Sequence, residues 1–112
     1  MEQGELIQKC IEACKACENA CRECAFACLQ EKDVAALRTC IQNDLECARI
    51  CATTVDLLIM DSRFRSEIVA LCMSSCEVCQ QECEKHAEHM EHCRRCAEAC
   101  QICLEACRQL VA

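Results

Sequence analysis

The sequence predicts an all-α protein, an up-down four-helix bundle with a cysteine-lined core. Its 112 residues include 0 Pro and 1 Gly, so the chain contains few residues that would break a helix. Its 18 cysteines recur mostly at alternating steps of three and four residues. That period keeps side chains on one face of a helix, whereas a strand needs a period of two. The length suits one domain, residues 1–112.

Four helices are expected, at about residues 4–30, 33–59, 63–87 and 90–110. The first, third and fourth each carry an uninterrupted row of cysteines along a single face. Turned toward one axis, these rows would line the interior of a bundle with thiols. The rows are Cys10, Cys14, Cys17, Cys21, Cys24 and Cys28; Cys72, Cys76, Cys79 and Cys83; and Cys93, Cys96, Cys100, Cys103 and Cys107.

The second segment has a broken cysteine row, Cys40, Cys47 and Cys51, and Asn43 is expected to fill the gap. There Asn43 would either set the register of the helices or act as a weak oxygen donor beside the thiols. An apolar row lies one residue over, and it either flanks the core or forms an association surface. Its members are Ile41, Leu45, Ala48, Ala52, Val55 and Ile59.

The boundaries between the segments differ in clarity. Charged or polar residues separate the first two pairs of segments, with Asp33 a candidate N-cap of the second helix. The third boundary carries no such signal, so one long helix from about residue 67 to 110 remains an alternative. A hairpin near residues 87–91 is preferred, because it lets all four rows face one axis.

Composition and charge exclude several classes of protein. The net charge of −7, with acidic and basic residues mixed, argues against nucleic-acid binding. No apolar run approaches the roughly 20 residues that a membrane span requires. The start of the chain has no secretory signal, which predicts a cytoplasmic protein whose thiols are kept reduced. A thiolate metal site is therefore favoured over a disulfide framework.

Soft thiolates select Cu(I), Zn(II) or iron–sulfur clusters. Thiolates buried without compensating charge are costly, and one Cu(I) per thiolate leaves a nearly neutral core, whereas zinc on four thiolates leaves each site at −2. The cysteine runs also differ from those typical of iron–sulfur proteins. The pattern thus predicts a store for many Cu(I) ions and not an enzyme. A general zinc or cadmium sink, and less readily a thiol-disulfide redox protein, are the alternatives.

The row of the third segment continues beyond its last cysteine. His86 and Met90 prolong it, and His89 and His92 lie in the same turn region. Imidazole and thioether groups bind Cu(I) without carrying charge, so these four side chains are candidate ligands at a copper entrance.

Two stretches resemble the bacterial copper storage proteins: Cys-Ile-Glu-Ala-Cys-Lys-Ala-Cys-Glu-Asn-Ala-Cys-Arg-Glu-Cys at 10–24, and Lys-His-Ala-Glu-His-Met-Glu-His-Cys-Arg-Arg-Cys-Ala-Glu-Ala-Cys at 85–100. The likeness extends over essentially the whole chain and is greatest for the cytosolic branch of that family. It implies a four-helix bundle filled with Cu(I), a homotetramer, a hairpin at the third boundary and an Asn near copper, here Asn43.

Overall fold

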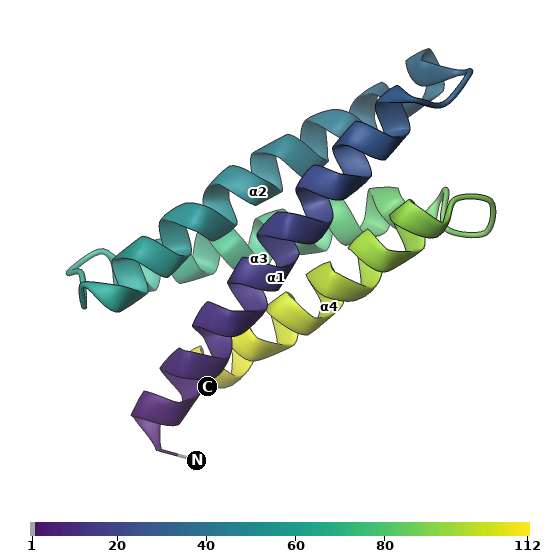
Figure 1. The fold of residues 1–112 in the computed structure, drawn as a ribbon. Helices are drawn as coiled ribbons and strands as arrows, with labels where there is room; N and C mark the ends of the chain where they lie inside the picture. The colour runs from purple at the N-terminus through teal and green to yellow at the C-terminus, as the bar shows by residue number, and fades with distance from the viewer. Residues whose placement is uncertain (1) are drawn as a thin grey trace.

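The computed structural model describes residues 2–112, which form four long α-helices joined by short connections (Figure 1). Helix α1 spans Gln3–Leu29, α2 Arg38–Ile59, α3 Arg65–Glu84 and α4 Glu91–Val111. A short 3-10 helix, η1 (Val34–Leu37), precedes α2. No strand occurs among the described residues, and the predicted all-α bundle is confirmed.

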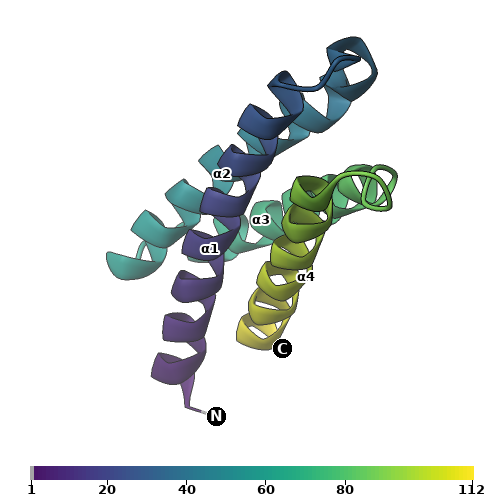
Figure 2. The same ribbon diagram turned by 45° about the vertical axis from the view of Figure 1, so that its right-hand side comes forward.

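Each helix packs against two others, α1 against α2 and α4, and α3 against the same two. The bundle measures 46 × 21 × 17 Å. The turn between α1 and α2 and the turn between α3 and α4 lie at one end, while the α2–α3 turn and both termini lie toward the other (Figures 1 and 2). We call the first of these the His–Met end, because His86 and Met90 belong to its second turn.

The third boundary is a hairpin, and the alternative of one long helix is wrong. Helix α3 ends at Glu84, and the next backbone N–H groups bond three residues back, from Lys85 to the carbonyl of Glu82 and from His86 to that of Cys83. This tightening of the last turn satisfies the free carbonyls at the helix end. Met90 then adopts an extended conformation, from which α4 starts.

The start of α2 differs from the expected boundary near residue 33. Residues Val34–Leu37 form the 3-10 helix, and the regular α-helix begins only at Arg38. Asp33 precedes the 3-10 helix but makes no side-chain capping hydrogen bond. The 3-10 helix buries Leu37, which is 1% exposed, at the His–Met end of the core.

The interior of the bundle consists largely of thiols. All eighteen cysteines are 0% exposed, and aliphatic side chains such as Val69 and Leu58 surround them. Free cysteine packs as a small hydrophobe, so the copper-free bundle has a continuous apolar core. None of the helices among residues 2–112 combines the length and apolar character that crossing a membrane needs.

The apolar row of α2 does not point in one direction. Ala48 and Val55 are 1% and 7% exposed and belong to the core, whereas Leu45 and Ile59 are 50% and 64% exposed. The row lies one residue, or about 100° of helix rotation, from the cysteine row. It therefore flanks the core, and only its outer members remain available for association.

Candidate metal centre

The cysteine rows of α1 and α4 face each other in register. Five pairs of Sγ atoms, one from each helix, lie 3.5–3.9 Å apart. The register persists because antiparallel helices rise equally per residue, so each step up one helix matches an equal step down the other. The pairs are Cys10–Cys107, Cys14–Cys103, Cys17–Cys100, Cys21–Cys96 and Cys24–Cys93.

Helices α2 and α3 form a second ladder with the same spacing. Its Sγ–Sγ distances run from 3.8 to 4.0 Å in the pairs Cys40–Cys83, Cys47–Cys76 and Cys51–Cys72. A fourth rung joins Asp44 to Cys79, with the carboxyl oxygen 3.3 Å from the thiol sulfur.

The two ladders together form layers across the bundle, which we call the thiol tube. Three layers hold four thiols each, and one holds three thiols and Asp44. The pair Cys10–Cys107 lies at one end of the tube and Cys28 at the other. The layers are Cys14, Cys51, Cys72, Cys103; Cys17, Cys47, Cys76, Cys100; Asp44, Cys21, Cys79, Cys96; and Cys24, Cys40, Cys83, Cys93.

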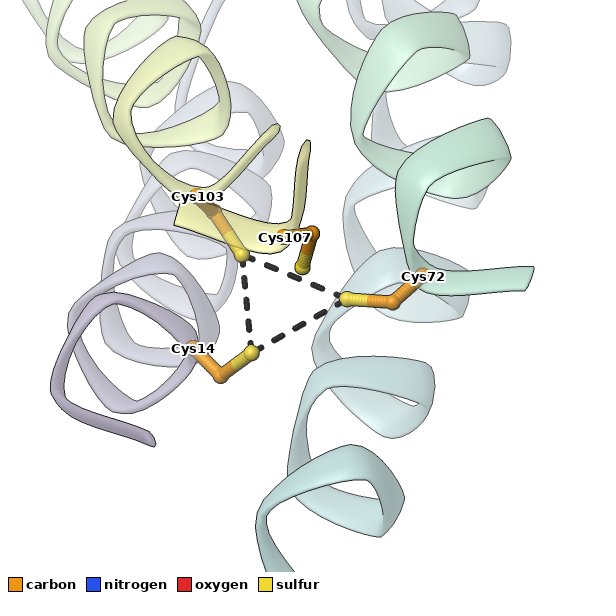
Figure 3. Close-up of side chains that lie close together, drawn as sticks. All are labelled: Cys14, Cys72, Cys103 and Cys107. Carbon is orange, nitrogen blue, oxygen red and sulfur yellow. Dashed lines mark hydrogen bonds between the residues drawn. The ribbon is translucent and has the colours of Figure 1, made fainter. Parts of the chain in front are cut away.

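The spacing within a layer suits a metal ion. Figure 3 shows Cys14, Cys72 and Cys103 directed at one another, with Sγ–Sγ distances of 3.9, 3.6 and 4.0 Å. An ion at the centre of that triangle would lie about 2.2 Å from each sulfur, close to the length of a metal–thiolate bond. Cys107 joins the three in a group whose sulfurs all lie within 4.8 Å of one another.

Contacts also run along the helices, from layer to layer. Thiols four residues apart on one helix lie 3.9 Å apart for Cys17–Cys21 and 4.0 Å apart for Cys24–Cys28. The shortest distances, however, lie between helices. The tube is therefore a continuous three-dimensional array of thiols and not four separate rows.

Asp44 is the residue that sequence reasoning missed. It occupies the gap in the α2 row that was assigned to Asn43, and that assignment was wrong, because Asn43 is only half-buried. Asp44 is 0% exposed and lies 3.3 Å from the sulfurs of both Cys79 and Cys96. Asn43 lies three residues after Cys40 and Asp44 lies four, so the helical period alone could not tell which of the two enters the core. The useful signal was the continued step from Cys40 to Asp44 to Cys47.

Burial keeps the proton on two groups of the tube, Asp44 and Cys28. Desolvation by burial is the largest cause that raises the pKa of Asp44 from 3.8 to about 9. Burial likewise raises the pKa of the Cys28 thiol to about 11. The copper-free tube thus keeps these groups protonated at neutral pH, and all eighteen thiols are free of disulfides.

The two ends of the tube differ in chemistry. Beyond Cys10–Cys107 the rows continue as apolar side chains, among them Leu58, Val69 and Leu110, which are 8% exposed or less. Thr54, also buried there, donates its hydroxyl to the carbonyl of Ile50 at 2.7 Å and so has its partner. This end is closed by ordinary core packing.

At the His–Met end, polar and sulfur-containing side chains lie where apolar side chains continue the rows at the other end. His86 and Met90 are half-buried and line an open hollow of about 590 Å³ together with residues 30–33 of the α1–α2 turn. The Met90 sulfur lies 4.0 Å from that of Cys93, which in turn lies 3.9 Å from that of Cys24. Sulfur atoms therefore follow one another from the hollow into the tube.

The two remaining histidines lie in different surroundings. His89 is exposed at the tip of the turn. His92 is half-buried and groups with Cys24, Cys28 and Cys93, and its buried Nε2 atom has no hydrogen-bond partner. The structure thus brings His92, His86 and Met90 together at the His–Met end of the tube and leaves His89 in solvent.

Comparison with known proteins gives concordant matches. Residues 3–112 match the family model described as copper storage protein. The chain is 40% identical to a cytosolic copper storage protein from Streptomyces lividans loaded with five coppers, with a TM-score of 0.95 over 97% of this chain and 94% of that one. It is 46% identical to the Cu(I)-bound copper storage protein BsCsp3, with a TM-score of 0.89 over 96% and 99%.

An uncharacterised cysteine-rich protein of Bacillus subtilis, YhjQ, is 48% identical over 72 residues, which are 64% of this chain and 67% of that protein. The family match spans all the helices and every cysteine of the tube. Together with a core of eighteen buried, free thiols, these likenesses show that the chain belongs to the copper storage protein family.

Proposed function

We propose that this copper storage protein holds its Cu(I) ions on the eighteen thiolates of the thiol tube. The observation that carries the proposal is the tube itself, in which neighbouring sulfurs from four helices lie 3.5–4.0 Å apart. Each bound Cu(I) replaces one thiol proton, so the buried core stays nearly neutral as it fills. Storage needs no catalytic step. The compartment we propose is the cytosol, as for the Streptomyces lividans relative.

Asp44 extends the proposed ligand set. In the layer that has three thiols, its carboxyl occupies the place of the fourth, 3.3 Å from two sulfurs. Loss of its proton would supply one negative charge and a harder oxygen donor there. Cu(I) prefers sulfur and nitrogen to oxygen, so this layer would hold copper less tightly than the four-thiol layers.

The His–Met end is the proposed entrance. The opposite end is filled by apolar side chains, whereas His86 and Met90 border an open hollow that leads to Cys93. Neutral imidazole and thioether donors hold Cu(I) more loosely than thiolates do, which suits capture and transfer at a mouth. His92, beside Cys24 and Cys93, would be the next ligand inward, and exposed His89 would make the first encounter.

We also propose that the chain assembles as a homotetramer, as the family resemblance implies. Several large apolar side chains are half or more exposed on the single chain, including Leu45, Ile59, Leu71 and Val78. Assembly would remove part of this surface from water.

Anaerobic titration of the fully reduced protein with Cu(I) tests the storage function. We expect saturation at about one Cu(I) per thiol, because each ion neutralises one thiolate. Bound copper and remaining free thiols are counted in parallel. Cu(I) added to zinc-loaded protein is expected to displace the zinc. Saturation at two or three equivalents would contradict storage and indicate a carrier of single ions.

The entrance is tested with His86→Ala combined with Met90→Leu. We expect copper uptake from, and loss to, a competing chelator to slow, while the number of bound ions falls by at most a few. The control is Met60→Leu, which removes an exposed methionine at the opposite end of the bundle. Transfer rates of the first variant equal to those of the wild type would place the entrance elsewhere.

Asp44→Asn tests the charge state of the buried carboxyl through the pH dependence of stability. The folded copper-free protein keeps Asp44 protonated up to a pKa of about 9, whereas the unfolded chain releases this proton near 3.8. The stabilisation that protonated Asp44 contributes is complete below pH 3.8 and is lost as the pH rises through about 9. Between them the free energy of unfolding should fall with pH by up to about 1.4 kcal/mol per unit.

The wild type should show this slope and Asp44→Asn should lack it, so the difference in free energy of unfolding between the two proteins should change with pH. Urea unfolding of the reduced, copper-free wild type and variant at several pH values between about 5 and 8 measures it. Parallel pH profiles of the two proteins would mean that Asp44 is already ionised when the protein is folded.

The tetramer is tested with Leu45→Glu combined with Ile59→Glu, both on the outer side of α2. Two buried carboxylates in an interface are costly, so we expect light scattering to report the monomer mass with copper capacity unchanged. Leu71→Glu with Val78→Glu is the matched pair on α3. An unchanged mass for the α2 variant would exclude this face, and a change only in the α3 pair would assign the interface there.

A further inference from the structure

Glu82 and His86 form a partly enclosed pair beside the entrance. The Glu82 Oε2 atom lies 3.1 Å from Nε2 of His86, and the two side chains are only 12% and 21% exposed. Another pair at the same helical spacing is far more exposed: the side chains of Arg94 and Glu98 are 49% and 60% exposed. Exposed pairs contribute little, whereas an enclosed one restrains both side chains.

The backbone of His86 is fixed on both sides. Its N–H donates to the carbonyl of Cys83 at 3.0 Å, and its own carbonyl accepts from the N–H of Met90 at 3.0 Å. Two residues of the proposed copper path thus hold the main chain of His86. The remaining freedom is the rotation and tautomer of the imidazole ring, and the ring contacts Glu82.

A carboxylate can only accept hydrogen bonds, and a neutral imidazole has one N–H and one bare nitrogen. The nitrogen that faces Glu82 must therefore carry the hydrogen, so Nε2 donates and Nδ1 keeps its lone pair. Histidines that bind metals commonly donate the other ring N–H to a carboxylate in this way, which fixes the tautomer and raises the basicity of the ligating nitrogen.

We propose that Glu82 is a positioning residue for copper transfer: it holds His86 in the tautomer whose Nδ1 is free to receive Cu(I) at the entrance. The inference rests on the proposed entrance and goes one step further, to the residue that prepares its imidazole. Glu82 does not bind the metal itself. Its Oε1 accepts from the Lys85 ammonium at 3.1 Å, its Oε2 is engaged by His86, and carboxylate oxygen is a poor donor to Cu(I).

Glu82→Gln is the direct test. The side chain keeps its shape, but an amide can donate as well as accept, so either tautomer of His86 becomes possible. We expect Cu(I) transfer to and from bathocuproine disulfonate to slow by about 10-fold, a typical effect of losing such a partner. The number of bound ions should not change. The double variant Glu82→Gln with His86→Ala should be no slower than His86→Ala alone, because both changes act on one group.

Glu84→Gln is the matched control. It removes the same charge two residues further along α3, where Glu84 accepts only from Gln80 and is exposed. We expect wild-type transfer rates. A second readout is independent of copper: nitrogen NMR of the copper-free protein should show His86 in the Nε2–H tautomer, and a mixture of both tautomers in Glu82→Gln. Helix content, from circular dichroism, should match in all variants.

The outcomes separate this inference from the entrance on which it rests. If His86→Ala slows transfer and Glu82→Gln does not, the entrance stands and the role of Glu82 is wrong. If neither slows transfer, the entrance itself is wrong. Equal slowing in Glu82→Gln and Glu84→Gln would show an effect of overall charge and would also overturn the proposal, as would an unchanged His86 tautomer in Glu82→Gln.

Discussion

The structure depends on one constraint: every group inside the bundle must be electrically neutral. Eighteen thiols with no exposed surface form a stable core as S–H groups, because they then pack like small hydrophobes. As free thiolates they would carry an intolerable buried charge. Monovalent copper satisfies the same constraint, since one Cu(I) replaces one proton. The core can therefore fill with metal while its electrostatics barely change, and the same property that folds the chain permits storage.

The register of the helices turns this constraint into a metal site. Antiparallel helices with cysteines at equal steps bring thiols opposite one another over the length of the tube, so neighbouring sulfurs lie 3.5–4.0 Å apart. At that separation an ion reaches sulfurs from two or three helices. Asp44 follows the same register and obeys the same requirement of neutrality. This carboxyl occupies a thiol position and stays neutral because it keeps its proton.

The two ends of the tube differ in chemistry because different residues continue the cysteine rows at each end. Each row runs past its last cysteine, and the residue at the next inward position decides what the end does. Leu58, Val69 and Leu110 close one end, whereas His86 and Met90 border a hollow at the other. The carboxylate of Glu82 adds an outer contact to that arrangement, because it accepts a hydrogen bond from Nε2 of His86. In the proposed entrance, this leaves Nδ1 of His86 free to receive Cu(I).

The sequence by itself determined the helices, the inward cysteine rows and the family, because helical period is a local property that steps of three and four residues reveal. It did not determine the phase of α2, where Asn43 and Asp44 both satisfied the period. The tertiary structure decided that choice, since only the packing of α2 against α1 and α3 selects which residue enters the tube. It also decided which thiols face one another, the position of the third hairpin and the pairing of Glu82 with His86. Each of these depends on how helices far apart in sequence, or a turn and a helix end, meet in space.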